Sequence, residues 1–180
     1  MGFLFLKTTS QMTELISAER IAKRIKTLAR KINKDYKGKK PIFIGVLNGS
    51  FILIADLVRE IKVDCEIDFV KLSSYGDEKI SSGQVKLLKE LNCEIKGRDI
   101  LVVEDIIDSG LSASFIRKLI LKEKPASLRF VTLLYKKDIC KIDFEIDYIG
   151  FNIGNEFVIG YGLDFAQKYR NLKAVYVLKG

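Results

Sequence analysis

The stretch that decides the fold is "ILVVEDIIDSGLSASFIRKLI", residues 100–120. It begins as an unbroken run of Ile, Leu and Val, which is typical of a strand buried on both faces of a parallel sheet. Three carboxylates, Glu104, Asp105 and Asp108, follow within five residues, and a Ser-Gly-Leu-Ser turn then leads into an amphipathic helix. Because like charges this close repel unless a positive group joins them, the end of this strand predicts a ligand site.

The turn after the acids has the features of a phosphate site. Gly110 permits unusual backbone dihedrals and close approach, Ser109 and Ser112 offer hydroxyl groups, and free N–H groups at a helix start favour an anion. The acids suit Mg²⁺ or the vicinal hydroxyls of a sugar. The structural alternative, in which Asp108, Ser109 and Ser112 only cap the helix, needs one acceptor and leaves the other acids unexplained. The loop therefore predicts a sugar-phosphate site with Mg²⁺.

Strands and helices alternate along the rest of the chain, which predicts a parallel sheet covered on both faces. Helices are expected at 17–36 (with Ser17 as the cap), 51–61 and 111–123. Strands or extended pieces are expected at 41–47, 63–75, 84–91, 99–105, 127–136, 147–153, 156–162 and 174–179. Sites in such sheets lie beyond the carboxyl ends of the strands, which is where the three acids fall.

The expected strand at 63–75 starts with a strict alternation of apolar and acidic residues. Val63, Cys65, Ile67 and Phe69 fall on one face, and the acids at positions 64, 66 and 68 fall on the other. This pattern predicts a strand with one buried face and one exposed face.

Bulk properties favour one compact domain spanning 1–180. The 180 residues are 48% hydrophobic, and no linker divides them. The net charge of +8 is spread along the chain without a basic tail, so nucleic acid is not an expected partner. Three scattered cysteines and no histidine argue against zinc and fit a reducing, cytoplasmic location. No apolar run is long enough for a membrane span. Without histidine, a general base must be Asp, Glu, Lys, Tyr or Cys.

The segment "VVEDIIDSGLS" (102–112) closely resembles, without a gap, the phosphoribosyl-diphosphate (PRPP) motif of type I phosphoribosyltransferases. Segments 45–61, 73–76, 133–137 and 148–172 resemble, in order, those of the hypoxanthine-guanine branch, so the likeness covers nearly all of residues 12–178. It implies a central, mainly parallel twisted sheet flanked by helices, with a small hood and a mobile flap at about 74–84. It also implies transfer of the 5-phosphoribosyl group from PRPP to hypoxanthine, with guanine as a further substrate, using Mg²⁺.

The resemblance assigns roles to the acidic loop. Glu104 and Asp105 would bind the ribose hydroxyls, and Asp108 would act as general base at purine N7. The metal-binding carboxylates would be Glu104, Asp105 and Asp164. The 5′-phosphate would be held at the turn, by Asp108, Ser109, Gly110, Leu111 and Ser112.

The resemblance also assigns a purine set and a diphosphate set. The purine would contact Ile106, Lys136, Phe157, Val158 and Asp164, with Lys136 donating to the 6-oxo group and Phe157 stacking on the base. The diphosphate would contact Asn48, Gly49, Ser74, Tyr75 and Arg170. The residues alone also allow structural interpretations. Lys136 could be a solvated lysine at a strand end, "EFVIG" could belong to the core, and Arg170 could be a surface charge.

Position 48 departs from the family pattern, because many relatives have Lys where this chain has Asn48. The family can have a non-proline cis peptide bond before this position. The missing charge puts a side-chain contact between Asn48 and diphosphate in doubt, whereas main-chain N–H groups at 48–50 remain available to bind it.

Three other classes of protein share some of these features. A regulator with the PRPP fold that binds RNA or DNA without turnover fits the positive charge, but it need not keep both Asp108 and Lys136. A phosphoacceptor receiver domain is shorter and places its acids differently. A dinucleotide-binding fold lacks its GxGxxG motif here. The choice among hypoxanthine, guanine and xanthine is left open, and the family implies a homodimer or homotetramer.

Overall fold

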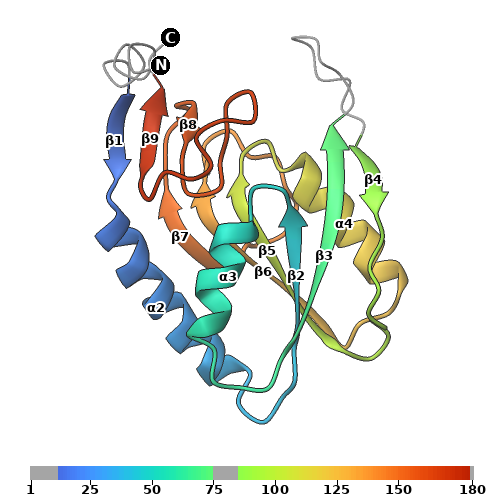
Figure 1. Ribbon diagram of the computed structural model, residues 1–180. Helices are drawn as coiled ribbons and strands as arrows, with labels where there is room; N and C mark the ends of the chain where they lie inside the picture. Colours follow the sequence, from blue (N-terminus) through green and yellow to red (C-terminus); the bar gives the residue numbers. More distant parts are fainter. Residues whose placement is uncertain (1–11, 75–84, 179–180) are drawn as a thin grey trace.

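The computed structural model describes residues 12–74 and 85–178 (Figure 1). Tyr75 and nearly all of the expected flap at 74–84 lie outside these residues. The helices are α2 (Ala18–Asp35), α3 (Phe51–Arg59) and α4 (Leu111–Lys122). The strands are β1 (Met12–Ile16), β2 (Ile42–Leu47), β3 (Glu66–Ser74), β4 (Val85–Lys89), β5 (Asp99–Ile107), β6 (Ser127–Tyr135), β7 (Tyr148–Asn152), β8 (Val158–Ile159) and β9 (Val175–Leu178).

A six-stranded sheet in the order β4-β3-β2-β5-β6-β7 forms the centre of the molecule. Every neighbouring pair is parallel except β3 and β4, which are antiparallel. The predicted, mainly parallel sheet is therefore confirmed. Strands β2 and β5 lie side by side, with Gly45 opposite Val103. This pairing places the loop that begins at Asn48 beside the acidic loop that ends β5.

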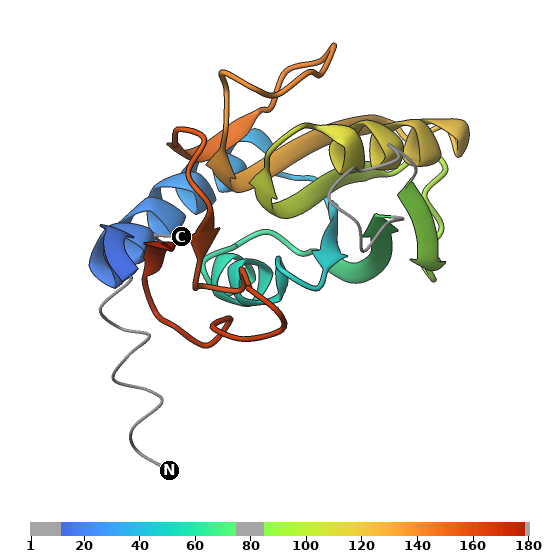
Figure 2. The ribbon, with the colours of Figure 1, turned by 90° about the horizontal axis from the view of Figure 1, so that it is seen from above.

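Helices cover both faces of this sheet, with α2 and α3 on one face and α4 on the other (Figure 2). Alternate residues of β5 enter the two cores. Leu101 and Val103 pack with the α2 and α3 side, whereas Ile100 and Val102 pack with the α4 side. Burial on both faces explains why this strand is a continuous apolar run rather than an alternating one.

Helix α2 follows the prediction from its apolar spacing. Ser17 caps it by accepting a hydrogen bond from the main-chain N–H of Arg20 at 3.3 Å. The apolar side chains spaced three and four residues apart are buried, namely Ile21, Ile25, Leu28 and Ile32. None of the described helices is long and apolar enough to cross a membrane.

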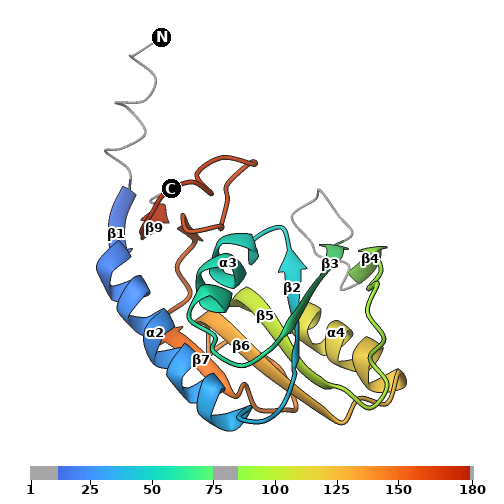
Figure 3. The ribbon, with the colours of Figure 1, turned by 60° about the horizontal axis from the view of Figure 1, so that its bottom comes forward.

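A second, three-stranded antiparallel sheet in the order β1-β9-β8 forms the predicted hood. It joins the two ends of the described chain, with Met12 opposite Leu178 (Figure 3). The segment between β8 and β9 loops over the carboxyl edge of the large sheet, so the hood closes one side of the region where the acidic loop lies.

The prediction for residues 63–75 is wrong in its boundaries and in its faces. Strand β3 begins only at Glu66. Ile67 is 47% exposed, whereas Asp68 is 8% exposed. The buried carboxylate of Asp68 accepts hydrogen bonds from the main-chain N–H groups of Asn92 at 2.5 Å and Cys93 at 3.0 Å. These donors stabilise the charged form, and the pKa of Asp68 is depressed even though burial opposes this. The alternation shows where side chains point but not which of them a distant loop covers.

Candidate active site

A two-part cleft lies beyond the carboxyl ends of β2, β5 and β6, where ligands bind in sheets of this kind. Its first part, about 300 Å³, is lined by residues 46–49, Leu72, residues 104–106 and residues 108–112. Its second part, about 490 Å³, adds Lys136 and the hood residues Phe157, Val158, Leu163, Asp164, Gln167 and Arg170. Asn48, Asp105 and Asp108 line both parts. The structure thus brings together nearly all of the predicted site residues that it describes.

The acidic pair at the end of β5 consists of a buried Glu104 and a half-buried Asp105 that lines the cleft. Glu104 is buried, and its Oε1 atom has no hydrogen-bond partner among the described residues. The carboxylate of Asp105 lies against Gly49, where a Cβ atom would overlap it. Burial raises the pKa of Asp105 to about 6. Burial, reinforced by the neighbouring Asp105 charge, raises the pKa of Glu104 well above its ordinary range. The Arg170 guanidinium favours the ionised form of Asp105, but burial outweighs it, and no cation offsets the burial of Glu104 within the described residues.

These carboxylates fit Mg²⁺ delivered together with a substrate. Within residues 12–74 and 85–178, no three acidic or thiol side chains gather into a metal site made of protein alone. Mg²⁺ is typically held by one or two carboxylates plus substrate phosphates and waters. The orphaned oxygen of Glu104 and the half-buried carboxylate of Asp105 match that arrangement. Asp164 lies near enough to Asp105 to raise its pKa, but is itself paired with Arg170 at 2.8 Å.

The turn between β5 and α4 is open to an anion. Gly110, with a φ of 87°, is the N-cap residue and has no side chain to cap the helix. The Leu111 N–H donates to Ser109 Oγ at 3.5 Å, so of the three residues in the capping interpretation only Ser109 makes such a contact among the described residues. The main-chain N–H groups of Ser109 and Gly110 have no main-chain partner in the described part of the chain. The N–H of Lys141 donates to the Ser109 carbonyl at 3.0 Å and holds the turn in place. Ser109 and Gly110 both line the first part of the cleft, and free main-chain N–H groups at a helix start favour an anion.

Lys136 and Asp108 form an ion pair in the second part of the cleft, with 2.9 Å between Nζ and Oδ2. The Lys136 side chain is only 7% exposed, whereas that of Asp108 is 49% exposed. The main-chain N–H of Lys136 donates to the Ile107 carbonyl at 3.0 Å, which fixes the two strand ends beside each other. The interpretation of Lys136 as a solvated lysine is therefore wrong. The pair presents a donor and an acceptor side by side, which complements a ligand that carries an acceptor atom next to an N–H donor.

The hood supplies the opposite wall. Phe157 is 52% exposed and makes an edge-on contact with Phe165, with 5.8 Å between ring centroids. Val158 is buried. The interpretation of "EFVIG" as core is therefore right for Val158 but not for the exposed ring of Phe157. Arg170 donates from Nη1 to the Gly162 carbonyl at 2.7 Å and pairs with Asp164. Arg170 is thus a fixed residue of the cleft rather than a mobile surface charge.

The other residues predicted to lie in the site are Asn48, Ile106 and Ser74, and the structure places each of them differently. The Leu47–Asn48 peptide bond is cis, as the family resemblance suggested. Ile106 lines both parts of the cleft. Ser74 ends β3, with its main chain opposite Val85. In the second part of the cleft, the sequence analysis missed three lining residues, Leu72, Leu163 and Gln167. Leu163 stands beside the predicted Asp164 and could have been found from it, but nothing in the sequence marks the other two.

We expect the acidic pair to make the ligand-free protein less stable as the pH rises. The folded protein holds a proton on Asp105 up to a pKa of about 6, whereas the unfolded chain releases it near 3.9. The cost is absent below about pH 4, grows through pH 6, and is on the order of 2 kcal/mol above it. Asp105→Asn should therefore equal the parent in unfolding free energy at pH 4 and exceed it at pH 7.

Urea denaturation at both pH values measures this difference, with Asp143→Asn, at an exposed position, as the control. Mg²⁺ and PRPP together should stabilise the parent but not Asp105→Asn. A variant that is equally or less stable than the parent at pH 7 would show that the Asp105 carboxylate carries no such cost.

Comparisons with known proteins agree with this geometry. A family model described as the phosphoribosyl transferase domain matches residues 11–166. The chain is 46% identical over 165 residues to the hypoxanthine-guanine phosphoribosyltransferase of Bacillus subtilis, covering 92% of each. It is 44% identical over 165 residues to the bifunctional protein TilS/HprT of Listeria monocytogenes, covering 92% of this chain but only 26% of that protein. The chain thus spans about a quarter of the length of this bifunctional relative.

A solved structure shows the same architecture. The crystal structure of a hypoxanthine-guanine phosphoribosyltransferase from Bacillus anthracis, with a HEPES molecule in its active site, matches with a TM-score of 0.87 at 45% identity. The match covers 92% of this chain and 98% of that one. From its fold, its acidic phosphate loop and these matches, the chain belongs to the phosphoribosyltransferase family, in the hypoxanthine-guanine branch.

Proposed function

We propose that the chain is a purine-salvage enzyme that transfers the 5-phosphoribosyl group from PRPP to hypoxanthine, giving IMP and diphosphate, with guanine as a second substrate. The observation that carries the proposal is the Lys136–Asp108 pair, placed in one cleft with the uncapped turn at 108–112. One half of the cleft has donors for a phosphate, and the other has a matched donor and acceptor for an oxopurine. A nucleotide joins those two groups.

The first part of the cleft would hold the ribose 5-phosphate. The carboxylates of Glu104 and Asp105 accept hydrogen bonds from the ribose hydroxyls, and the N–H groups at 108–112 donate to the 5′-phosphate. Mg²⁺ bound with PRPP would supply the positive charge that offsets the buried acids and the diphosphate. The main-chain N–H groups of Asn48 and Gly49, which have no main-chain partner among the described residues, would hold the diphosphate.

The second part would hold the base and handle its proton. The bond from ribose C1′ to the diphosphate oxygen breaks, the purine nitrogen N9 bonds to C1′, and the N7 proton passes to the Asp108 carboxylate. The Lys136 ammonium donates to the 6-oxo group, while Phe157 stacks on the ring. Adenine presents an amino donor at this position, which would leave Lys136 facing another donor. Main-chain groups near Val158 and Asp164 read the 2-position.

We extend the proposal to the domain organisation, the cellular location and the oligomeric state of the protein. Residues 1–180 act as a single phosphoribosyltransferase domain in the cytoplasm, and the protein forms a homodimer or homotetramer. Sedimentation equilibrium distinguishes these states from a monomer. The Trypanosoma cruzi hypoxanthine phosphoribosyltransferase is the subject of a study on the role of its C-terminal region in oligomeric state, which gives precedent for testing assembly.

A turnover assay tests the function directly. Protein, Mg²⁺, PRPP and hypoxanthine are mixed, and the ultraviolet change on nucleotide formation is followed, with adenine in place of hypoxanthine as the control. We expect turnover that requires PRPP and is strong only with oxopurines. Steady-state kinetics on hypoxanthine, guanine and xanthine then rank the three bases. No turnover, together with tight RNA binding, would instead favour the regulator.

Asn48 offers a further prediction about the diphosphate. Among the described residues, the cationic side chains lining the second part of the cleft are Lys136 and Arg170, and both are already ion-paired. Asn48→Lys would add an unpaired charge and should tighten diphosphate product inhibition about fivefold at low salt. Asn171→Lys, which adds the same charge at an exposed position that does not line the cleft, is the control. Equal inhibition constants in the parent and Asn48→Lys would place diphosphate away from residue 48.

A further inference from the structure

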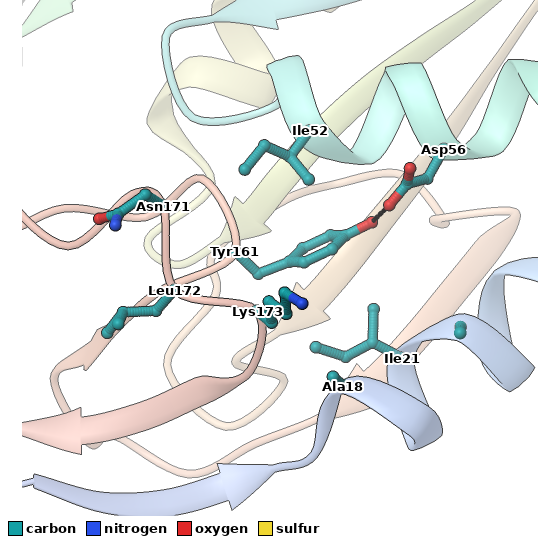
Figure 4. Close-up of a pocket in the computed structure, with 9 residues that line it drawn as sticks. Ala18, Ile21, Ile52, Asp56, Tyr161, Asn171, Leu172 and Lys173 are labelled. Carbon is teal, nitrogen blue, oxygen red and sulfur yellow. Dashed lines mark hydrogen bonds between the residues drawn. The ribbon is translucent and has the colours of Figure 1, made fainter.

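The hood carries one polar contact that the proposed chemistry does not use. Tyr161 lies behind the purine wall, and Figure 4 shows its ring crossing a cavity toward Asp56 of α3. Its hydroxyl donates to Asp56 Oδ2 at 2.6 Å, and the ring is buried. Burial and this bond raise the pKa of Tyr161, so the phenol remains the donor. The bond is charge-assisted and therefore stronger than an ordinary hydrogen bond.

This bond is the main polar tie between the hood segment and the body. In the described part of the chain, it is the only side-chain hydrogen bond from residues 157–178 to residues outside that segment. The cavity beside it, about 250 Å³, is lined by Ile21, Ile52 and residues of the 171–173 turn. Val158, Tyr161 and Leu163 of the hood share the apolar core that α3 enters, so the hydrogen bond acts together with this packing in setting how close the hood lies to α3.

Tyr161 is coupled through its backbone to the residues of the purine wall. It has a φ of 50° between Gly160 and Gly162, whose φ values are 94° and 98°. Its N–H donates to the Leu172 carbonyl at 2.8 Å, and the next N–H, of Gly162, donates to Arg170 at 2.9 Å. A Cβ atom at Gly162 would overlap the Gly49 carbonyl. The turn is therefore tight, and a shift of Tyr161 would move Arg170 and its ion-paired partner in the cleft.

The other end of the bond is fixed in the body. Asp56 lies on α3, which begins at Phe51 directly after the loop at 48–50. The helix packs into the core through Leu53, Ile54 and Leu57. The bond therefore links the hood wall of the purine cleft to the rigid element that carries the diphosphate loop.

We propose that Tyr161 and Asp56 are positioning residues, whose hydrogen bond sets the width of the cleft between the hood and the Lys136–Asp108 pair. The expected effect on hypoxanthine binding rests on the proposed function, whereas the role of the bond in holding the hood against α3 does not. Loss of the bond lets the hood move away, which weakens contacts with the purine while leaving the ribose phosphate loop unchanged.

The test compares two tyrosines that each donate to an aspartate, of which Tyr148 also accepts a hydrogen bond from Arg129 Nη1 at 2.8 Å. Tyr148 is also buried and donates to an aspartate, with 2.8 Å from its hydroxyl to Asp35 Oδ2. It starts β7, away from the cleft lining. Tyr161→Phe should raise the KM for hypoxanthine about tenfold, the loss expected for one hydrogen bond to a charged group, while the Kd for Mg²⁺–PRPP changes less than about twofold. Tyr148→Phe should change neither constant. Asp56→Asn keeps an acceptor oxygen for the Tyr161 hydroxyl. Its KM for hypoxanthine should therefore stay close to the wild-type value.

Amide hydrogen exchange of the free proteins gives a second readout, which does not depend on turnover. Residues 157–172 should exchange faster in Tyr161→Phe than in Tyr148→Phe at matched stability. Equal exchange, or an equal hypoxanthine KM in the two variants, would overturn the positioning role. Wild-type protein that fails to make IMP would instead contradict the proposed function, and the exchange comparison would still decide whether the bond holds the hood.

Discussion

Asp108→Asn is expected to lower kcat with hypoxanthine by about 10²–10⁴-fold, the range for loss of a general base, and to change the affinity for Mg²⁺–PRPP by less than about threefold. The carboxamide keeps the shape of the side chain but cannot take up the N7 proton. In the proposed site, main-chain N–H groups would hold PRPP at this position, and the substitution leaves them in place. The effect should therefore fall on the chemical step and not on substrate capture.

Single-turnover kinetics with saturating PRPP measure this step, and calorimetry measures PRPP affinity. Asp138→Asn is the matched control, because Asp138 is an exposed acid in the loop that follows Lys136. An unchanged rate in Asp108→Asn would remove this residue as the base. A parallel loss of PRPP affinity would instead assign the carboxylate to substrate binding.

Lys136→Ala should lower the preference for hypoxanthine over adenine, as the ratio of the two kcat/KM values, by at least about 10²-fold. The ammonium is buried, so no other cation or water network readily replaces it once it is removed. The 6-oxo group then loses a charged donor, and the amino group of adenine no longer meets a competing donor. PRPP affinity should change much less, because Lys136 lines only the second part of the cleft.

Lys137→Ala provides the control, since Lys137 is the adjacent residue with an exposed side chain. It should leave both the base preference and the PRPP affinity unchanged. If Lys136→Ala weakens PRPP binding as much as it weakens base discrimination, the assignment of Lys136 to the 6-oxo group is wrong.

The fold was predictable where the local pattern and the burial agree. The apolar run of β5 is buried on both faces, and the spacing of apolar residues in α2 gave its length to within one or two residues. The order of alternating strands and helices then required the acids at 104–108 to fall at the carboxyl edge of the sheet. The local sequence was therefore enough to predict both the architecture and the position of the acidic loop at 104–112.

Features that depend on distant parts of the chain were not predictable from spacing. Asp68 is buried because main-chain donors 24 and 25 residues later reach its carboxylate. The Lys136–Asp108 pair joins residues 28 apart, and the Tyr161–Asp56 bond joins residues 105 apart. Composition and periodicity carry no information on such pairs. The family resemblance supplied roles for Asp108 and Lys136, but not their direct contact or the function of Tyr161.

The central claim is that the loop from Glu104 to Ser112 binds a phosphorylated ribose together with Mg²⁺. A crystal structure of the protein with Mg²⁺ and PRPP tests it most directly. We expect the 5′-phosphate oxygens to accept hydrogen bonds from main-chain N–H groups within 108–112, and the ribose hydroxyls to contact Glu104 and Asp105. A 5′-phosphate bound anywhere else, with the turn at 108–112 left empty, would contradict the account.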